Sequence, residues 1–384
     1  MKNLTRVVFY LSFPLSFIAF IFPIYARNLG SSVIEIGYLY ALFSIITLIT
    51  KPLIGKLIDK RGRKLSLIIG VILYLIVNFL YIVSSNLTHL LIIRVFQGFA
   101  ASFLWISVNT IVSDLSDEKT RGENFGIIGQ TQVRGEFIGS TIGFIFILYN
   151  SMMKSLNDVF IIYFIFNIIA LFIAVKSVKE TKVVKKVEDT SFRNSKFLII
   201  FFVIIGFIAL ISSITAPIYL IYLSDYITND LGLIVLLFVP GSILATFLPK
   251  KFGAFADKHA KLPIIFLGLF INAVMQIFIP FITEYYPFMF FYTLLNVVNM
   301  FYAPALSAII IEFLGENRRG KSYSLYSLAT GIGGSIGPLI GTFLYQNVNS
   351  SSVFFVKSIL LLIIVVVIYL INLIYKNRVQ KNIL

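Results

Sequence analysis

Residues 55–64 read GKLIDKRGRK and residues 253–261 read GAFADKHAK, so one Gly-x-x-x-Asp-Lys pattern occurs twice, 198 residues apart. The same displacement relates further polar and glycine positions, which form the pairs Asp114 and Glu312, Arg121 and Arg319, Gly135 and Gly333, Gly139 and Gly337, and Gly143 and Gly341. A register without gaps over so many positions indicates an internal repeat. The sequence therefore predicts two copies of one structural unit.

Both copies contain long apolar stretches. The chain has 384 residues, of which 58% are hydrophobic and 13% are charged, whereas about 25% of the residues in soluble domains are charged. A helix of about 20 apolar residues crosses the hydrocarbon core of a bilayer. Twelve such stretches occur, at approximately residues 7–28, 33–54, 65–84, 90–114, 124–149, 158–176, 197–224, 231–250, 262–282, 287–313, 322–346 and 353–375. They lack the alternation of barrel strands, which favours helices.

The predicted fold is an all-α polytopic membrane protein, with twelve transmembrane helices in two pseudo-symmetric six-helix bundles. An even number of spans in each half gives both copies the same orientation. We expect the bundles to occupy residues 1–176 and 197–384. Residues 177–196 form the predicted cytoplasmic linker, a solvated basic hinge that could contact anionic lipid headgroups.

The net charge of +15 follows the predicted topology. When loops are assigned to alternate sides, 26 of the 32 Lys and Arg residues lie on the side of the N-terminus. The positive-inside rule then predicts a multi-pass protein of the plasma membrane with both termini cytoplasmic. Since topology accounts for the charge, we expect no nucleic-acid partner. Four basic residues lie inside the spans or at their edges instead: Lys51, Arg94, Arg134 and Lys357.

No pattern of catalytic or metal-binding residues is found. The chain has no cysteine and contains neither HExxH nor GxSxG, and its two histidines, His89 and His259, are predicted on opposite sides of the membrane. Residues 315–322, GENRRGKS, formally satisfy the phosphate-loop pattern, but long apolar spans flank them instead of a βαβ unit. We therefore expect no enzyme activity, no metal and no cofactor.

The chain resembles the major facilitator superfamily of secondary transporters over essentially its whole length. Residues 55–64 look like the family's signature between the second and third helices, and residues 253–261 look like a weaker second copy. The fourth span carries a motif similar to the RxxQG motif of the drug and proton antiporter branch, formed by Arg94, Gln97, Gly98, Ala100 and Ala101. The resemblance implies transport of a small organic substrate by alternating access. We expect the protein to be a monomer in the lipid bilayer.

The signature loop and its second copy are the predicted gating motif. Arg63 is expected to pair with Asp114 at the cytoplasmic end of span four, while Asp59 can face the positive end of span eleven. Gly55 is expected to allow close approach of helices. The second copy would supply Gly253, Asp257, Lys261 and Glu312. Such contacts would favour the outward-open state, and the alternative is a role in topology and loop folding alone.

Charged residues within spans four and five are candidates for proton coupling. A charge in the middle of a bilayer is unfavourable by about 2.5–3.5 kcal/mol or more, so it is a functional candidate by default. Glu136 is the expected proton carrier, with Arg94 and Arg134 as its neighbours in the spans, and H⁺ is the expected coupling ion. The alternative is a static ion pair of Glu136 with Arg134 or Arg94.

The resemblance implies that helices one, four, seven and ten surround the substrate. Polar and aromatic residues at helical spacing on these spans are the cavity candidates, and they are Gln97, Trp105, Asn109, Ser212, Thr215, Tyr219, Tyr292, Asn296 and Asn299. Hydrogen bonds between helices are the competing explanation for each of them.

The expected function is proton-coupled efflux of amphipathic compounds. The chain departs from the antiporter pattern, because Ser140 follows Gly139 and span one has no acidic residue. A proton symporter or uniporter that imports a small metabolite, and a non-transporting sensor on the same fold, therefore remain as alternatives.

Overall fold

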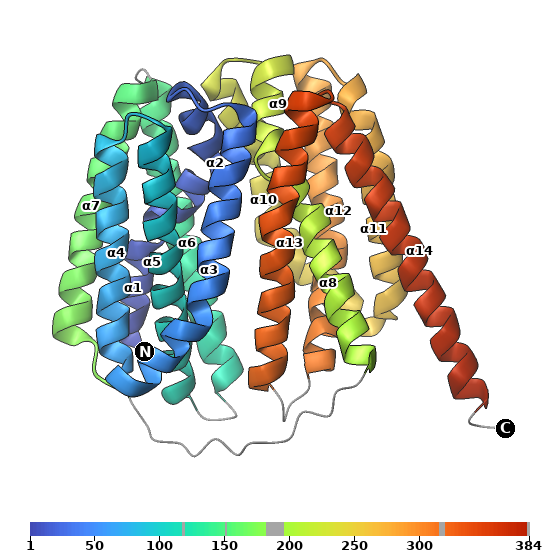
Figure 1. Cartoon of the computed structure of the whole chain (residues 1–384), viewed down its shortest axis with the longest axis horizontal. Coiled ribbons are helices and arrows are strands. Elements are labelled where there is room, and N and C mark those ends of the chain that lie inside the picture. Colours follow the sequence, from blue (N-terminus) through green and yellow to red (C-terminus); the bar gives the residue numbers. More distant parts are fainter. Residues whose placement is uncertain (117–119, 150–151, 182–195, 315–318, 382–384) are drawn as a thin grey trace. The chain divides into compact units, whose positions relative to one another are not determined.

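A computed structural model describes residues 1–116, 120–149, 152–181, 196–314 and 319–381 of the chain, and every regular element in them is a helix. The chain divides into two units, Met1–Asp189 and Thr190–Leu384. The described residues of the first unit form α1 (Lys2–Leu11), α2 (Phe13–Asn28), α3 (Val33–Arg61), α4 (Arg63–Val83), α5 (Leu87–Asp114), α6 (Arg121–Tyr149) and α7 (Met152–Ser177) (Figure 1).

The described residues of the second unit repeat this order. They form α8 (Lys196–Ile214), α9 (Ile218–Tyr226), α10 (Leu231–Lys258), α11 (Lys261–Phe278), the short 3₁₀ helix η1 (Ile279–Phe281), α12 (Tyr285–Leu314), α13 (Arg319–Asn347) and α14 (Ser352–Lys381). The predicted linker, residues 177–196, lies mostly outside the described residues.

The first span of each unit is interrupted. Helices α1 and α2 form one span that is broken at Ser12, and α8 and α9 form one span that is broken after Ile214. Proline follows each break closely, at Pro14 and Pro217. Proline has no N–H to donate and its ring clashes with the carbonyl four residues earlier, so it interrupts the helical hydrogen bonds at these points.

Eleven segments of the described residues are helical, long and apolar enough to cross a membrane. These segments correspond to eleven of the twelve predicted spans. The exception is the fifth predicted span, residues 124–149, which lies in α6. That helix has 29 residues, and its N-terminal half carries Gln130, Gln132, Arg134 and Glu136. The predicted all-α polytopic membrane fold is confirmed, and α6 is the span whose polar side chains need a functional explanation.

Glycines bring the backbones of two helices together in each unit. A Cβ added at Gly139 in α6 would overlap the backbone of Phe13 in α2. A Cβ added at Gly337 in α13 would likewise overlap Leu210 and Ser213 in α8. The neighbouring glycines of both helices, at Gly135, Gly143, Gly333 and Gly341, make equally close approaches. The glycine repeat therefore acts in close helix packing, as small residues do in membrane helices.

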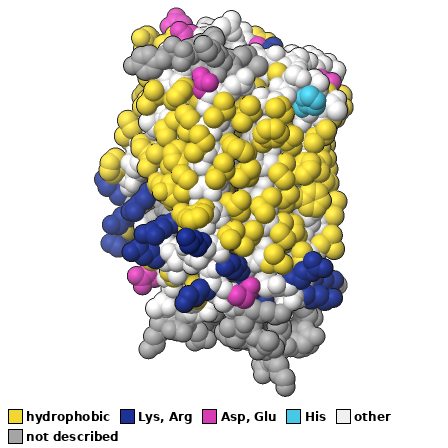
Figure 2. Space-filling model, turned by 90° about the vertical axis from the view of Figure 1, so that its left-hand side faces the viewer, with side chains coloured by type: hydrophobic (Ala, Val, Ile, Leu, Met, Phe, Trp, Pro, Cys, Tyr) yellow, Lys and Arg dark blue, Asp and Glu magenta, His cyan; other side chains and the backbone are white. Residues whose placement is uncertain are grey.

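Each unit has an apolar core, and its outer surface is apolar as well. Core side chains of the first unit come from α1, α4, α5 and α7, for example Val8, Leu67, Val108 and Ala174. Those of the second unit come from α8, α11, α12 and α14. Figure 2 shows a broad apolar band on the side of the first unit, with Lys and Arg side chains gathered toward the end where the N-terminus lies. Such a surface suits a lipid bilayer, whose apolar interior is flanked by charged headgroups.

Candidate functional site

The signature sequence is almost entirely helical. Helix α3 continues to Arg61 and α4 begins at Arg63, so the connection consists of Gly62 alone. Gly62 has φ 104°, a conformation that side-chain-bearing residues rarely adopt. Residues 55–61 of the signature therefore continue α3, and residues 63 and 64 begin α4. Hydropathy marks where the lipid-facing part of a helix ends, and both helices extend past that point.

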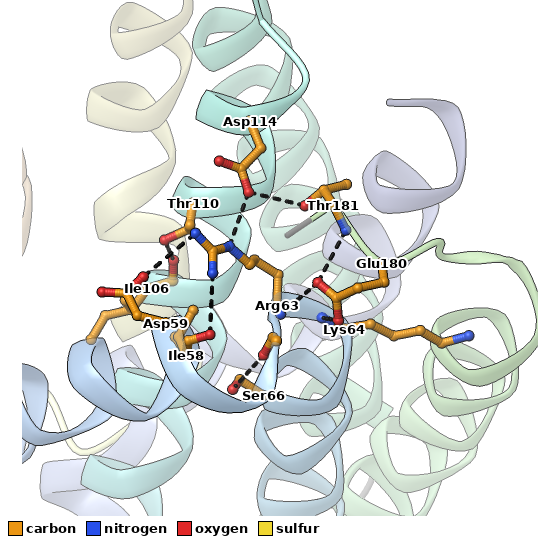
Figure 3. A network of polar contacts seen from close by, with 11 residues as sticks. Ile58, Asp59, Arg63, Lys64, Ser66, Ile106, Thr110, Asp114, Glu180 and Thr181 are labelled. Carbon is orange, nitrogen blue, oxygen red and sulfur yellow. Dashed lines mark hydrogen bonds and ion pairs between the residues drawn. The ribbon is translucent and has the colours of Figure 1, made fainter. Parts of the chain in front are cut away.

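Arg63 is the centre of a polar network at this turn (Figure 3). Its Nε donates to Asp114 Oδ2 at 3.0 Å, so the expected pair is present. Its Nη1 donates to the carbonyl of Ile58 at 3.3 Å, and its Nη2 lies 3.4 Å from Asp59 Oδ1. The guanidinium is buried, and each of its three nitrogens faces a different acceptor. Arg63 thus links the ends of α3, α4 and α5.

Glu180, which follows α7, completes this network and was not predicted from the sequence. Its carboxylate accepts the main-chain N–H of Arg63 at 2.8 Å and that of Lys64 at 3.1 Å. These amides are the first of α4, where a negative charge is favourable. The next residue, Thr181, donates its hydroxyl to Asp114 Oδ2 at 3.2 Å (Figure 3). Glu180 stands 117 positions from Arg63, and no local pattern distinguishes it within a basic stretch.

The second copy of the motif is built differently. Helix α10 ends at Lys258 and α11 begins at Lys261, with Ala260 at the position that corresponds to Gly62. Ala260 has φ −62°, so the tight turn of the first unit is absent here. Asp257 is exposed, and the side chain of Glu312 lies outside the described residues. A Cβ at Gly55 or Gly253 would meet no described atom within 4 Å, so the expected close approach at these glycines is not found.

Arg94 occupies an aromatic site in the first unit. It is buried in α5, and its Nη1 donates to Gln97 Oε1 at 2.8 Å. The guanidinium carbon lies 3.4 Å from the ring centre of Phe22 and 5.1 Å from that of Tyr40. The Nε of Arg94 is buried without a hydrogen-bond partner among the described residues. Cation–π contacts therefore stabilise this charge in place of a carboxylate.

Glu136 and Arg134 do not form the static pair that was the alternative to coupling. Arg134 is exposed, and Glu136 is half-buried and accepts a hydrogen bond from Gln132 Nε2 at 2.8 Å. No ion pair to Glu136 is found within the described residues, so this carboxylate of α6 has no cationic partner there.

A polar network in the second unit connects several of the cavity candidates. The Tyr219 hydroxyl donates to Gln276 Oε1 at 3.0 Å, and Gln276 Nε2 donates to Asn272 Oδ1 at 3.2 Å. Asn272 Nδ2 in turn donates to Asn299 Oδ1 at 2.6 Å. Tyr292 lies against Tyr219, with ring centres 5.3 Å apart. The network extends from α9 through α11 to α12.

Lys357 of α14 borders this network and was not among the predicted site residues. Its Nζ donates to Thr215 Oγ1 at 2.7 Å and lies 5.5 Å from the ring centre of Tyr219. In the sequence Lys357 was recognised as a charge at the edge of a span, and this charge is the signal by which it could have been identified as a site residue.

The remaining cavity candidates are more scattered. Asn109 and Ser212 are exposed. Trp105 packs against the apolar core of the first unit. Asn296 donates its Nδ2 to the carbonyl of Tyr292 at 2.9 Å, one helical turn earlier. These four residues give no common polar surface within either unit.

Comparison with known proteins agrees with this architecture. The family model of the Major Facilitator Superfamily matches residues 5–253 and 201–382. Quinolone resistance protein NorA of Staphylococcus aureus (strain COL) is 26% identical over 331 residues, which cover 85% of this chain and 84% of NorA. Multidrug resistance protein MdtG of Proteus mirabilis (strain HI4320) is 26% identical over 350 residues, with 87% and 86% covered.

A solved structure shares the fold. The crystal structure of the nucleoside transporter NupG aligns with a TM-score of 0.72 at 14% sequence identity, covering 96% of this chain and 98% of NupG. The family model matches nearly the whole chain. The chain therefore belongs to the Major Facilitator Superfamily, whose members are membrane transporters and not enzymes.

Proposed function

We propose that this transporter exports amphipathic organic compounds in exchange for protons. The observation that carries the proposal is Glu136, an intramembrane carboxylate that pairs with no cation in the described residues. Such a group can bind and release a proton during the transport cycle without first breaking an ion pair. The names of NorA and MdtG, as resistance proteins, favour export over import.

Arg94 is proposed to assist this coupling. Gln97 and the ring of Phe22 hold its guanidinium, so the charge is fixed within the first unit. A fixed cation in an apolar setting attracts an anion more strongly than it would in water. We propose that deprotonated Glu136 and an acidic group of the substrate each serve as this anion, at different stages of the cycle.

Proteoliposomes test the proposal. Norfloxacin serves as the probe, and its movement is followed by fluorescence with and without an imposed pH gradient. We expect the gradient to drive norfloxacin against the direction of proton flow in the wild-type protein. Glu136→Gln should abolish the effect of the gradient while norfloxacin exchange at equal pH continues. Glu284→Gln, which changes an exposed carboxylate before α12, is the matched control.

The alternatives give different results. Movement of a solute in the direction of proton flow would indicate a symporter, and flux without an effect of the gradient would indicate a uniporter. Binding without flux would indicate a sensor. If Glu136→Gln keeps its response to the gradient, Glu136 is not the proton carrier.

The Arg63 network is proposed to act as part of the cytoplasmic gate. It joins the ends of α3, α4 and α5 and the segment after α7 through hydrogen bonds of side chains with one another and with the main chain. A network of this kind favours the conformation in which it is intact. Its exposed member, Asp59, is the residue available for contacts that change during the cycle.

A further inference from the structure

Lys357 is a buried charge in a very apolar helix. It lies in α14, five residues after the first residue of the helix, Ser352, and its exposed fraction is 7%. The surrounding segment, Ser352–Leu370, is the most apolar of the eleven candidate spans. A Lys side chain near the end of a span normally extends to the interface, whereas this one is enclosed.

Its contacts leave the positive charge without a counterion. The Nζ donates one hydrogen bond, to Thr215 Oγ1 at 2.7 Å, and faces the ring of Tyr219. An ammonium group has three N–H donors. No carboxylate pairs with Lys357 in the described residues. Arg63 differs, because this buried cation pairs with Asp114. A buried ammonium group with neither an ion pair nor a full set of hydrogen bonds is strongly unfavourable, and an anion bound beside it would stabilise it.

The neighbouring polar groups cannot serve as that anion, and they hold the site in place. The amides of Gln276, Asn272 and Asn299 form hydrogen bonds with one another and with the Tyr219 hydroxyl. They therefore fix the Tyr219 ring beside the ammonium group without approaching the ammonium itself. Lys357, Thr215 and Tyr219, which we name the lysine site, form a rigid arrangement with unused donor capacity.

Aromatic rings lie next to the lysine site. Tyr219 contacts Tyr292 and Phe354, with ring centres 5.3 and 5.7 Å away. Phe354 also contacts Tyr222. The cation thus stands beside a cluster of rings, and this combination matches a compound with an acidic group attached to an apolar or aromatic body.

We propose that the lysine site binds the carboxylate of the transported compound, so that the substrate class is amphipathic organic acids and zwitterions. This inference rests on the proposed export function and specifies its substrate. A buried cation without a carboxylate partner favours an anionic group over a purely cationic compound.

Binding measurements on the purified full-length protein test the inference. The probes are norfloxacin, which carries a carboxylate, and norfloxacin ethyl ester, which has the same ring system without it. The variants are Lys357→Gln, Lys357→Arg, and as a matched control Ser358→Ala, which removes a buried hydroxyl on the same helix turn. Equilibrium dialysis gives the Kd for each combination.

The wild-type protein should bind the acid more tightly than the ester. Lys357→Gln should weaken binding of the acid about tenfold or more, the loss expected for one hydrogen bond to a charged group. It should change binding of the ester by less than about twofold, since the charge interaction is missing there already. Lys357→Arg should retain part of the preference for the acid, and Ser358→Ala should retain all of it.

Three results would overturn the inference: a wild-type protein that binds the acid no better than the ester, a wild-type protein that binds neither probe, and a Lys357→Gln variant that weakens both probes equally. The last would indicate a structural role, or an ion pair formed in another conformation. Failure of the proposed export function would be seen separately, as absence of movement of both norfloxacin and its ethyl ester under a pH gradient in the wild-type protein.

Discussion

Glu180 shows how one side chain can hold a helix that is distant in sequence. Its carboxylate accepts two of the first main-chain N–H groups of α4, those of Arg63 and Lys64. It also fills the space beside Gly62, where an added Cβ would overlap it. The start of α4 therefore depends on a residue beyond the end of α7, and the Arg63 side chain takes its position from the same turn.

We expect Glu180→Gln to destabilise the first unit by about 0.5–1 kcal/mol, because the amide keeps the shape of the carboxylate but loses the charge that favours a helix N-terminus. The thermal unfolding midpoint in detergent measures the effect. Glu284→Gln removes an exposed carboxylate and should leave the midpoint unchanged. Equal midpoints for both variants and the wild-type protein would mean that the Glu180 contact contributes no stability.

Residues of this kind mark a limit of what a sequence reveals. Arg63 and Asp114 were predicted as a pair because both belong to a recognisable motif. Glu180 and Lys357 belong to none, and their partners are 117 and 142 positions away. Only the packing of helices determines which polar groups meet across such separations.

Among the helices, the pair formed by α8 and α13 depends on glycine. A Cβ at Gly333 would overlap the carbonyl of Gly206 and approach the N–H of Leu210. At Gly334, one residue further along α13, a Cβ would meet nothing within 4 Å. Gly333 and Gly334 are thus the same residue type at adjacent positions of one helix, and they differ in what surrounds them.

Opposite effects are therefore expected from Gly333→Ala and Gly334→Ala. The first forces α8 and α13 apart and should destabilise the protein by about 1–3 kcal/mol. Gly334→Ala reduces the conformational freedom of the unfolded chain, and the added methyl group meets no described atom within 4 Å in the folded protein. It should therefore stabilise the protein by about 0.5–1 kcal/mol. Unfolding midpoints of the two variants, measured side by side, give the comparison. Shifts in the same direction would refute the packing role of Gly333.

The helices were more predictable than their ends. Apolar stretches of about 20 residues located the spans, because bilayer thickness dictates that length. They did not reveal that α3 continues to Arg61 or that α1 and α2 are separate, since hydropathy reports the contact with lipid and not the hydrogen bonds of the backbone. Pro14 and Pro217 were the sequence signals for the breaks.

At the scale of the whole molecule, the gate proposal predicts a change in rate without a change in stability. Asp59 is largely exposed, and its ion pair with Arg63, formed across the turn at Gly62, contributes about 1 kcal/mol at most. Asp59→Asn should therefore hardly affect unfolding. It should nevertheless slow norfloxacin transport, while the Kd for norfloxacin stays the same.

Asp257→Asn is the comparison for this variant, because Asp257 occupies the corresponding place in the second copy, where Ala260 stands in place of Gly62 and the tight turn is absent. We expect a smaller effect on transport from it. Turnover at the wild-type rate in Asp59→Asn would contradict a gating role for the motif.

The orientation in the membrane can be tested with the same chain, because it contains no cysteine. Basic residues concentrate at 56–64 and 250–261, so the positive-inside rule assigns these turns to the cytoplasm. Ser85, between α4 and α5, and Asn229, between α9 and α10, are exposed at the opposite ends of their helices, whereas His259 is exposed at the turn after α10. Each position accepts a single cysteine without disturbing a core.

A membrane-impermeant maleimide applied to intact cells should label Ser85→Cys and Asn229→Cys. It should label His259→Cys only after the cells are permeabilised. Because the two reporters on the outer side come from different units, their agreement tests whether both copies of the repeat enter the membrane in the same direction, which an even number of spans in each unit requires. Labelling of Ser85→Cys with protection of Asn229→Cys would mean that the second unit is inverted, and the predicted parallel repeat would then be wrong.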